Sequence, residues 1–152
     1  MKVIYYKRRE LDVNEESELQ VTYCDLHTLL KKSDFVTLHV PLTRQTRHLI
    51  GQKELSIMKS TAFLINTSRG GAIDENALYD ALENREIGGA GLDVFEKEPI
   101  PKNDPLLKLS NVVLTPHVGG GSESLIYDLH RIKTNMVRVI EGRKPINMVE
   151  VI

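Results

Sequence analysis

The stretch Ala62–Glu83, AFLINTSRGGAIDENALYDALE, is the clearest guide to the fold of this 152-residue chain. It opens with the short apolar run Ala62–Asn66, which is typical of a buried strand, and continues into a polar turn with two glycines. Asp74 is then a candidate helix N-cap, and apolar residues follow it with helical spacing: Ala77, Leu78, Ala81 and Leu82. A strand, a turn and a helix in this order predict one unit of a parallel α/β sheet.

The same alternation of short apolar runs and amphipathic stretches continues on both sides of this unit. A second helix is expected after a cap at Asp25, and a longer helix is expected from Ser122 to Gly142. Further candidate strands are bounded by Lys, Pro, Ser, Asn or Gly: Val3–Tyr6, Phe35–Val40, Gly89–Asp93 and Val112–Thr115.

A dinucleotide-binding fold normally opens with a strand, a Gly-x-Gly-x-x-Gly turn and a helix. No such turn precedes Val3, and the glycine clusters at 88–91 and 119–121 have neither the spacing nor the preceding strand to replace it. We therefore expect an α/β fold with a partial Rossmann-like, doubly wound parallel sheet that begins at its second strand. Residues 1–142 are expected to form its single domain, and residues 143–152 an arm that returns to a domain absent from the chain.

Composition argues against several classes of protein. The chain has 20 Lys and Arg against 21 Asp and Glu, so it lacks the basic excess that nucleic acid or an anionic membrane would require. The single cysteine, Cys24, cannot form an internal disulfide, and nothing near it has metal-ligand spacing. No run of about 18 apolar residues occurs, and the N-terminus lacks the apolar region of a signal peptide. We expect a soluble cytoplasmic protein without a metal site, a nucleic-acid partner or a membrane partner.

Ligands of open α/β sheets bind beyond the carboxyl ends of the strands, so the residues that follow each candidate strand are candidates for a site. Cations, carboxylates and an imidazole converge there. In strand order, and including the last residue of two candidate strands (Val40 and Asp93), these residues are Lys7, Arg8 and Arg9, then Val40 and Pro41, then Thr67, Ser68 and Arg69, then Asp93, Glu96 and Glu98, then His117, Val118 and Gly119.

Three of these residues suit hydride transfer to a 2-oxo acid. The carbonyl must be polarised and protonated as hydride arrives, and a histidine such as His117 can act as the acid in this step. A carboxylate such as Glu98 would hold the tautomer of that histidine and keep it protonated. Arg69 can bind the carboxylate and the carbonyl of the substrate through the N–H donors of its planar guanidinium group.

The three segments that carry these residues resemble signatures of the D-isomer-specific 2-hydroxyacid dehydrogenases, in the right order and spacing. They are Asn66–Gly71 (NTSRGG), Gly91–Pro99 (GLDVFEKEP) and Thr115–Gly119 (TPHVG). The resemblance covers nearly the whole chain. It implies an incomplete NAD(P)-binding domain over residues 1–142 of an enzyme that acts on D-2-hydroxy acids.

The resemblance also implies roles for individual residues. The arginine of that family binds substrate, its histidine is the acid/base and its glutamate is the partner of the histidine, which transfers to Arg69, His117 and Glu98. Glu98 is preferred to its neighbour two positions earlier because the family glutamate immediately precedes a proline, here Pro99. The aspartate of the Gly-Leu-Asp-Val segment lies near the nicotinamide in the family, which points to Asp93.

Cofactor preference depends on the end of the first candidate strand. NAD-preferring relatives carry an acidic residue there, whereas this chain has Lys7-Arg8-Arg9, and arginine can hold a 2′-phosphate. NADP is therefore favoured over NAD. The other candidates for cofactor contact are Val40, Pro41, Thr67, Ser68, Arg69, Asp93, His117, Val118 and Gly119.

The branch within the family is less firmly indicated. The segment 98–107 and the basic turn resemble glyoxylate/hydroxypyruvate reductases, while a D-3-phosphoglycerate dehydrogenase and a non-catalytic, nucleotide-sensing module of the corepressor type are alternatives. A small 2-oxo acid is the expected substrate, a homodimer the expected assembly, and little or no turnover is expected from this chain alone. His27, His39, His48 and His130 belong to no recognised motif, which predicts surface or packing histidines.

Overall fold

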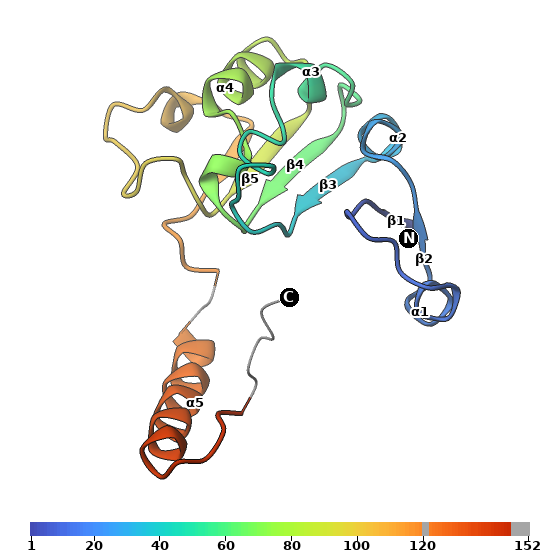
Figure 1. Cartoon of the computed structure of the whole chain (residues 1–152). Helices are drawn as coiled ribbons and strands as arrows, with labels where there is room; N and C mark the ends of the chain where they lie inside the picture. The colour runs from blue at the N-terminus through green and yellow to red at the C-terminus, as the bar shows by residue number, and fades with distance from the viewer. Residues whose placement is uncertain (120–121, 147–152) are drawn as a thin grey trace. The chain divides into compact units, whose positions relative to one another are not determined.

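The computed structural model describes residues 1–119 and 122–146 (Figure 1). The chain divides into two compact units, one comprising Met1–His117 and a second that begins at Val118. The predicted domain over residues 1–142 extends across both units and stays a prediction.

The strands of the first unit form two parallel sheets. The smaller sheet pairs β1 (Val3–Tyr5) with β2 (Val21–Tyr23). The larger sheet has the order β3-β4-β5-β6, and its strands are β3 (Phe35–Leu38), β4 (Phe63–Asn66), β5 (Gly89–Leu92) and β6 (Val112–Leu114).

Helices and short 3₁₀ turns connect these strands, and both predicted caps are present. The Asp25 carboxylate accepts a hydrogen bond from the Thr28 N–H, and the Asp74 carboxylate accepts from the N–H groups of Asn76 and Ala77. The helical elements are α1 (Val13–Leu19), α2 (Leu26–Lys32), α3 (Gln52–Leu55), η1 (Gly70–Ala72), α4 (Glu75–Glu83), η2 (Pro105–Lys108) and, in the second unit, α5 (Ser122–Ile140).

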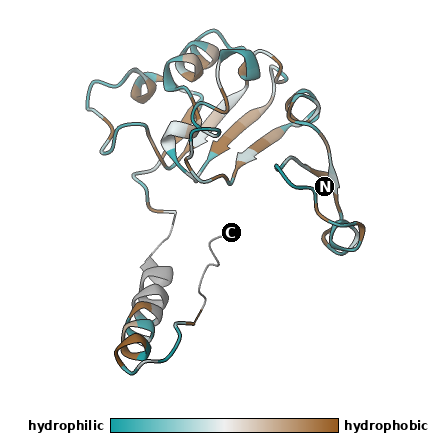
Figure 2. Cartoon of the chain, viewed as in Figure 1, coloured by the Kyte–Doolittle hydropathy of each residue, from teal (hydrophilic) through white to brown (hydrophobic). Residues whose placement is uncertain are grey.

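The core lies against one face of the larger sheet, because alternate strand residues point to opposite faces. Val36, Leu64 and Leu92 are buried there with apolar residues of α2, α3 and α4, and Figure 2 shows the apolar colour concentrated in the strands. Phe35 and Phe63 lie on the opposite face, where their stacked rings remain 64% and 41% exposed. The helices of the first unit therefore leave apolar surface on this face.

The strand order agrees with a doubly wound fold. The order 3-2-1-4-5-6 is matched in part: β2 and β1 correspond to places 3 and 2, β3, β4 and β5 to places 4, 5 and 6, and β6 lies beyond them. Among the described strands none corresponds to place 1, and the strands form two separate parallel sheets. The predicted Rossmann-like α/β fold is confirmed, while β2, α1 and α3 were not predicted.

The second unit contains α5, which begins at Ser122 as expected and is followed by Gly142 with a positive φ of 71°. The next residues return along the helix, since the Asn135 side chain exchanges two hydrogen bonds with the Ile146 backbone, at 3.0 and 2.7 Å. Most of the predicted arm, 147–152, lies outside the described residues, as do two glycines of the 119–121 cluster. Among the described helices, none combines the length and the apolar character that crossing a membrane requires.

Candidate active site

A cavity of about 440 Å³ opens beyond the carboxyl ends of β4, β5 and β6. Its walls include Arg69, Glu98 and His117, each of which follows a different one of these strands. The parallel arrangement is the reason: three strands that run in the same direction end at the same edge of the sheet. The structure thus brings the three predicted catalytic residues to one pocket.

The closest contact among these residues joins His117 to Glu98. The Nδ1 atom of His117 lies 2.8 Å from Oε2 of Glu98, and the other carboxylate oxygen accepts a hydrogen bond of 3.0 Å from the Phe95 N–H. The bond with His117 and then the bond from Phe95 lower the pKa of Glu98, so its carboxylate form is favoured. Both side chains stay partly exposed, 50% for His117 and 37% for Glu98, so the imidazole is open to the pocket.

Arg69 lies in a turn that the buried side-chain amide of Asn66 stabilises. Asn66, 1% exposed at the end of β4, donates from Nδ2 to the Arg69 carbonyl at 3.0 Å, and its Oδ1 accepts from the Ser68 N–H at 3.0 Å. The Arg69 guanidinium donates to the Ser68 carbonyl at 2.6 Å. Among the described residues it forms no ion pair with a carboxylate, so its charge is available to an anion.

Gly70 allows this turn to touch the loop that carries Glu98. A Cβ atom at position 70 would overlap the carbonyl carbon of Phe95, so only glycine permits the two backbones to approach so closely. The contact fixes the distance between the segment of Arg69 and the segment of Glu98.

Asp93 links the ends of the central strands beside the pocket. It is 5% exposed, its N–H donates to the Asn66 carbonyl at 3.0 Å, and its carboxylate accepts a hydrogen bond from the Thr115 hydroxyl. The backbone of Asp93 is thus held by the end of β4, and its buried carboxylate is held by the residue after β6. Its predicted place at the end of β5 agrees with the structure, whereas its cofactor contact stays a prediction.

The remaining predicted cofactor residues lie outside the walls of the cavity. Lys7, Arg8 and Arg9 follow β1, are exposed, and form no ion pair within the part of the chain that the structure describes. Val40 and Pro41 follow β3, Thr67 and Ser68 follow β4, and Val118 and Gly119 belong to the second unit. Their contacts with a cofactor stay predictions.

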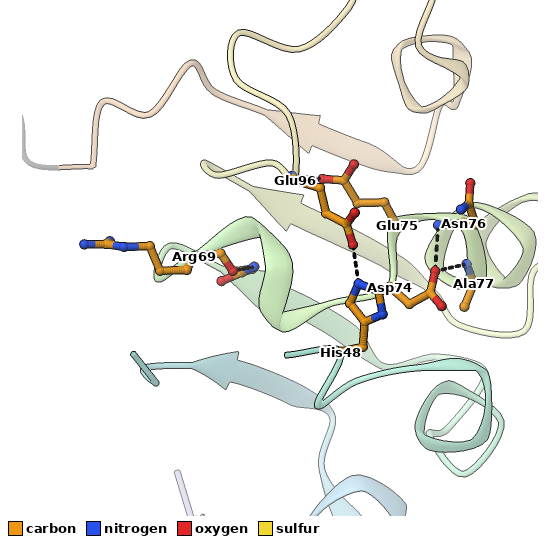
Figure 3. Close-up of polar contacts among 8 residues, drawn as sticks. His48, Arg69, Asp74, Glu75, Asn76, Ala77 and Glu96 are labelled. Atoms are coloured by element: carbon orange, nitrogen blue, oxygen red, sulfur yellow. Dashed lines mark hydrogen bonds and ion pairs between the residues drawn. The ribbon is translucent and has the colours of Figure 1, made fainter. Parts of the chain in front are cut away.

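Around this pocket, sequence reasoning singled out neither Arg47 nor His48 as a site residue, and it assigned no role to Glu96. Arg47 and Glu96 line the pocket, and His48 forms an ion pair with Glu96 with 2.6 Å between Nε2 and Oε1 (Figure 3). His48 was predicted to be a surface or packing histidine, and it is partly exposed but paired. No local pattern could show the pair because its members are 48 positions apart. Within residues 1–119 and 122–146, no cluster of His, Cys, Asp or Glu is suited to hold a metal ion.

The family model described as "D-isomer specific 2-hydroxyacid dehydrogenase, NAD binding domain" matches residues 1–119. The chain is 51% identical over 152 residues to a glyoxylate reductase of Korarchaeum cryptofilum, with 98% of this chain and 45% of the relative covered. It is 44% identical over 144 residues to glyoxylate/hydroxypyruvate reductase B of Salmonella newport, with 94% and 44% covered.

A solved structure with a similar fold comes from the same family. The NAD-complexed D-isomer-specific 2-hydroxyacid dehydrogenase of Lactobacillus delbrueckii ssp. bulgaricus matches with a TM-score of 0.84 and 37% identity, over 97% of this chain and 48% of that one. The chain spans slightly less than half the length of the relatives that it matches. It belongs to the D-isomer-specific 2-hydroxyacid dehydrogenase family and carries a Rossmann-like NAD(P)-binding domain of that family.

Proposed function

We propose that this chain is the cofactor-binding half of a reductase that transfers hydride from NAD(P)H to a small 2-oxo acid, glyoxylate or hydroxypyruvate. One observation carries the proposal: the 2.8 Å contact between His117 and Glu98 lies in the same cavity as Arg69. A histidine paired with a carboxylate, beside an arginine that forms no ion pair among the described residues, suits a reaction that adds a proton to the carbonyl of an anionic substrate. The names of the two relatives support the choice of substrate.

In this proposal His117 gives a proton to the carbonyl oxygen during reduction. Its Nδ1 atom is engaged by Glu98, which leaves Nε2 as the ring nitrogen that can face the substrate. The carboxylate stabilises the imidazolium before transfer and fixes the orientation of the ring. In the reverse direction the neutral ring would accept the proton of the hydroxy acid.

Arg69 holds the substrate. Its guanidinium can donate two parallel hydrogen bonds to the carboxylate of a 2-oxo acid and polarise the neighbouring carbonyl. Such a contact orients the carbonyl carbon, because a small substrate offers few other groups to bind.

The residues at the strand ends fit a dinucleotide. NAD(P)H supplies the hydride when it is bound. Asp93 is a buried acceptor suited to the amide of a nicotinamide, and the exposed cations Lys7, Arg8 and Arg9 suit a phosphate because no described carboxylate neutralises them. We propose NADP as the preferred cofactor on the basis of these three cations.

A chimera tests the proposed reaction. This chain would replace the matched region of the Korarchaeum cryptofilum relative, and oxidation of NADPH and NADH would be followed with glyoxylate and with hydroxypyruvate. We expect kcat/KM with glyoxylate within about tenfold of the unmodified relative, which corresponds to ~1.4 kcal/mol of transition-state stabilisation. A folded chimera that binds NADPH but turns over neither acid would contradict the proposal.

The same chimera tests the preference for NADP. Replacing Arg8 and Arg9 together by Ala should weaken NADPH binding about tenfold or more while NADH binding changes little, because only NADPH carries the 2′-phosphate. Lys2→Ala, a change of an exposed cation before β1, is the matched control. Equal losses for both cofactors would count against a 2′-phosphate contact.

A further inference from the structure

The ion pair between His48 and Glu96 lies next to the residues assigned above but has no role in that assignment. Its two atoms, Nε2 of His48 and Oε1 of Glu96, are 2.6 Å apart, and the side chains are 37% and 32% exposed. Figure 3 shows the two side chains facing each other, while Arg69 extends away from them. Both side chains are therefore partly exposed, and Glu96 also lines the cavity.

His48 also holds the segment that follows Arg69. Its backbone N–H donates to the Gly71 carbonyl at 2.8 Å, and two residues later Ile50 forms a parallel bridge with Ile73. Its φ of 49° lies in the left-handed region, where His, Asn and Asp are better tolerated than most residues. One residue therefore contacts the turn of Arg69 through its backbone and the loop of Glu98 through its side chain.

Glu96 is held from a second direction. Its backbone N–H donates to Oε1 of Glu75, in the first turn of α4, at 2.6 Å. Burial raises the pKa of Glu75, and the bond from Glu96 opposes that rise. Because Glu96 is anchored at its backbone by α4 and at its side chain by His48, the peptide at this position has little freedom.

Hydrogen bonds connect this peptide to Glu98 and His117, the proposed acid/base pair. Phe95, the residue before Glu96, donates its N–H to Glu98 at 3.0 Å, and Glu98 contacts His117 at 2.8 Å. Gly70 packs directly on the same stretch of backbone. A shift of Glu96 would therefore move Phe95 and alter the contact between Glu98 and His117.

We propose that His48 is a positioning residue of this site: its ion pair with Glu96 and its backbone bond to Gly71 hold the loop of Glu98 against the turn of Arg69. This inference rests on the proposed function of Arg69, Glu98 and His117. His48 itself touches neither substrate nor cofactor in this account. Its effect is exerted through the geometry of Glu98 and His117.

The test is a carbon-13 NMR titration of the Glu98 carboxylate in the 152-residue chain. His48→Asn tolerates the left-handed backbone, but its side chain is too short to reach Glu96, whereas His48→Gln keeps a donor at the same number of bonds from the backbone. Glu96→Ala removes the pair from the other side. His27→Asn, a change of an exposed histidine on α2, is the control.

The direction in which the pKa of Glu98 changes distinguishes a positioning effect of His48 from a direct electrostatic effect of its charge. Loss of positioning weakens the bond from His117, so the pKa of Glu98 should rise in both His48→Asn and Glu96→Ala. Direct charge effects would give opposite signs, because Glu96→Ala removes a negative charge and would lower the pKa of Glu98. Asp93, the other carboxylate that acts on Glu98, is the same in all variants.

We expect the pKa of Glu98 to rise in His48→Asn and in Glu96→Ala. In His48→Gln and His27→Asn it should stay at its value in the unaltered chain. No shift in His48→Asn, shifts of opposite sign in the two variants, or an equal shift in His48→Gln would overturn the proposal. If His48→Asn does not fold, the comparison uses Glu96→Ala and the conservative variant Glu96→Gln. The pKa of Glu98 should then rise in Glu96→Ala and stay unchanged in Glu96→Gln, and equal changes would overturn the proposal. The titration needs neither cofactor nor substrate, so its result is independent of turnover by the chimera.

Discussion

At the scale of single residues, the candidate site depends on contacts that the motifs only partly reveal. Arg69, Glu98 and His117 were predicted from their places after three strands, and the cavity brings them together. The pair of His48 and Glu96 could not be predicted, because it joins two loops through a contact that no sequence period marks. Sequence identifies the reacting groups more readily than the contacts that hold them.

Gly70 gives a residue-scale prediction about stability. Gly70→Ala should lower the free energy of unfolding by about 3 kcal/mol or more, since the added methyl group would overlap the backbone of Phe95 and force the two loops apart. Chemical denaturation followed by circular dichroism measures the change.

The control for that experiment is Gly51→Ala. A Cβ at Gly51 would meet its nearest neighbour, Oε2 of Glu54, at an ordinary 3.5 Å, so its cost should stay below about 1 kcal/mol. Equal costs at the two positions would show that the contact between Gly70 and Phe95 is looser than described.

At the scale of elements, local signals predicted the caps and missed the short or exposed pieces. Asp25 and Asp74 cap α2 and α4 as expected. The three-residue strand β2 was missed because its side chains are at most half-buried and give no apolar run. The helix α1 was missed because it buries no residue, so it lacks the apolar period that marks a packed helix.

The cap of α4 gives the prediction at this scale. Asp74→Ala should cost about 1 kcal/mol, because the N–H groups of Asn76 and Ala77 lose their acceptor at the start of the helix that also carries Glu75. Thermal unfolding measures the loss. Asp74→Ser should retain most of the stability, and Asp80→Ala, an exposed change within the same helix, should cost little; a full loss in Asp74→Ser would contradict the capping role.

At the scale of the whole molecule, the α/β class and the parallel sheet follow from the alternation of strands and helices along the chain. The presence of two separate sheets agrees with the lack of a glycine-rich strand-turn-helix segment among the described residues. The exposed rings of Phe35 and Phe63 lie on the sheet face that the helices of the first unit leave open. The predicted homodimer stays a prediction.

The substitution His117→Asn in the chimera shows whether Arg69, Glu98 and His117 perform the reaction. Asparagine tolerates the left-handed φ of 55° at this position, so the fold should persist while the acid/base group is lost. We expect kcat for glyoxylate to fall about 10²- to 10⁴-fold with NADPH binding retained, and no comparable fall in the control His27→Asn. A His117→Asn chimera that keeps its kcat within about twofold, well short of the loss expected for a general acid, would show that His117 is not the acid/base residue.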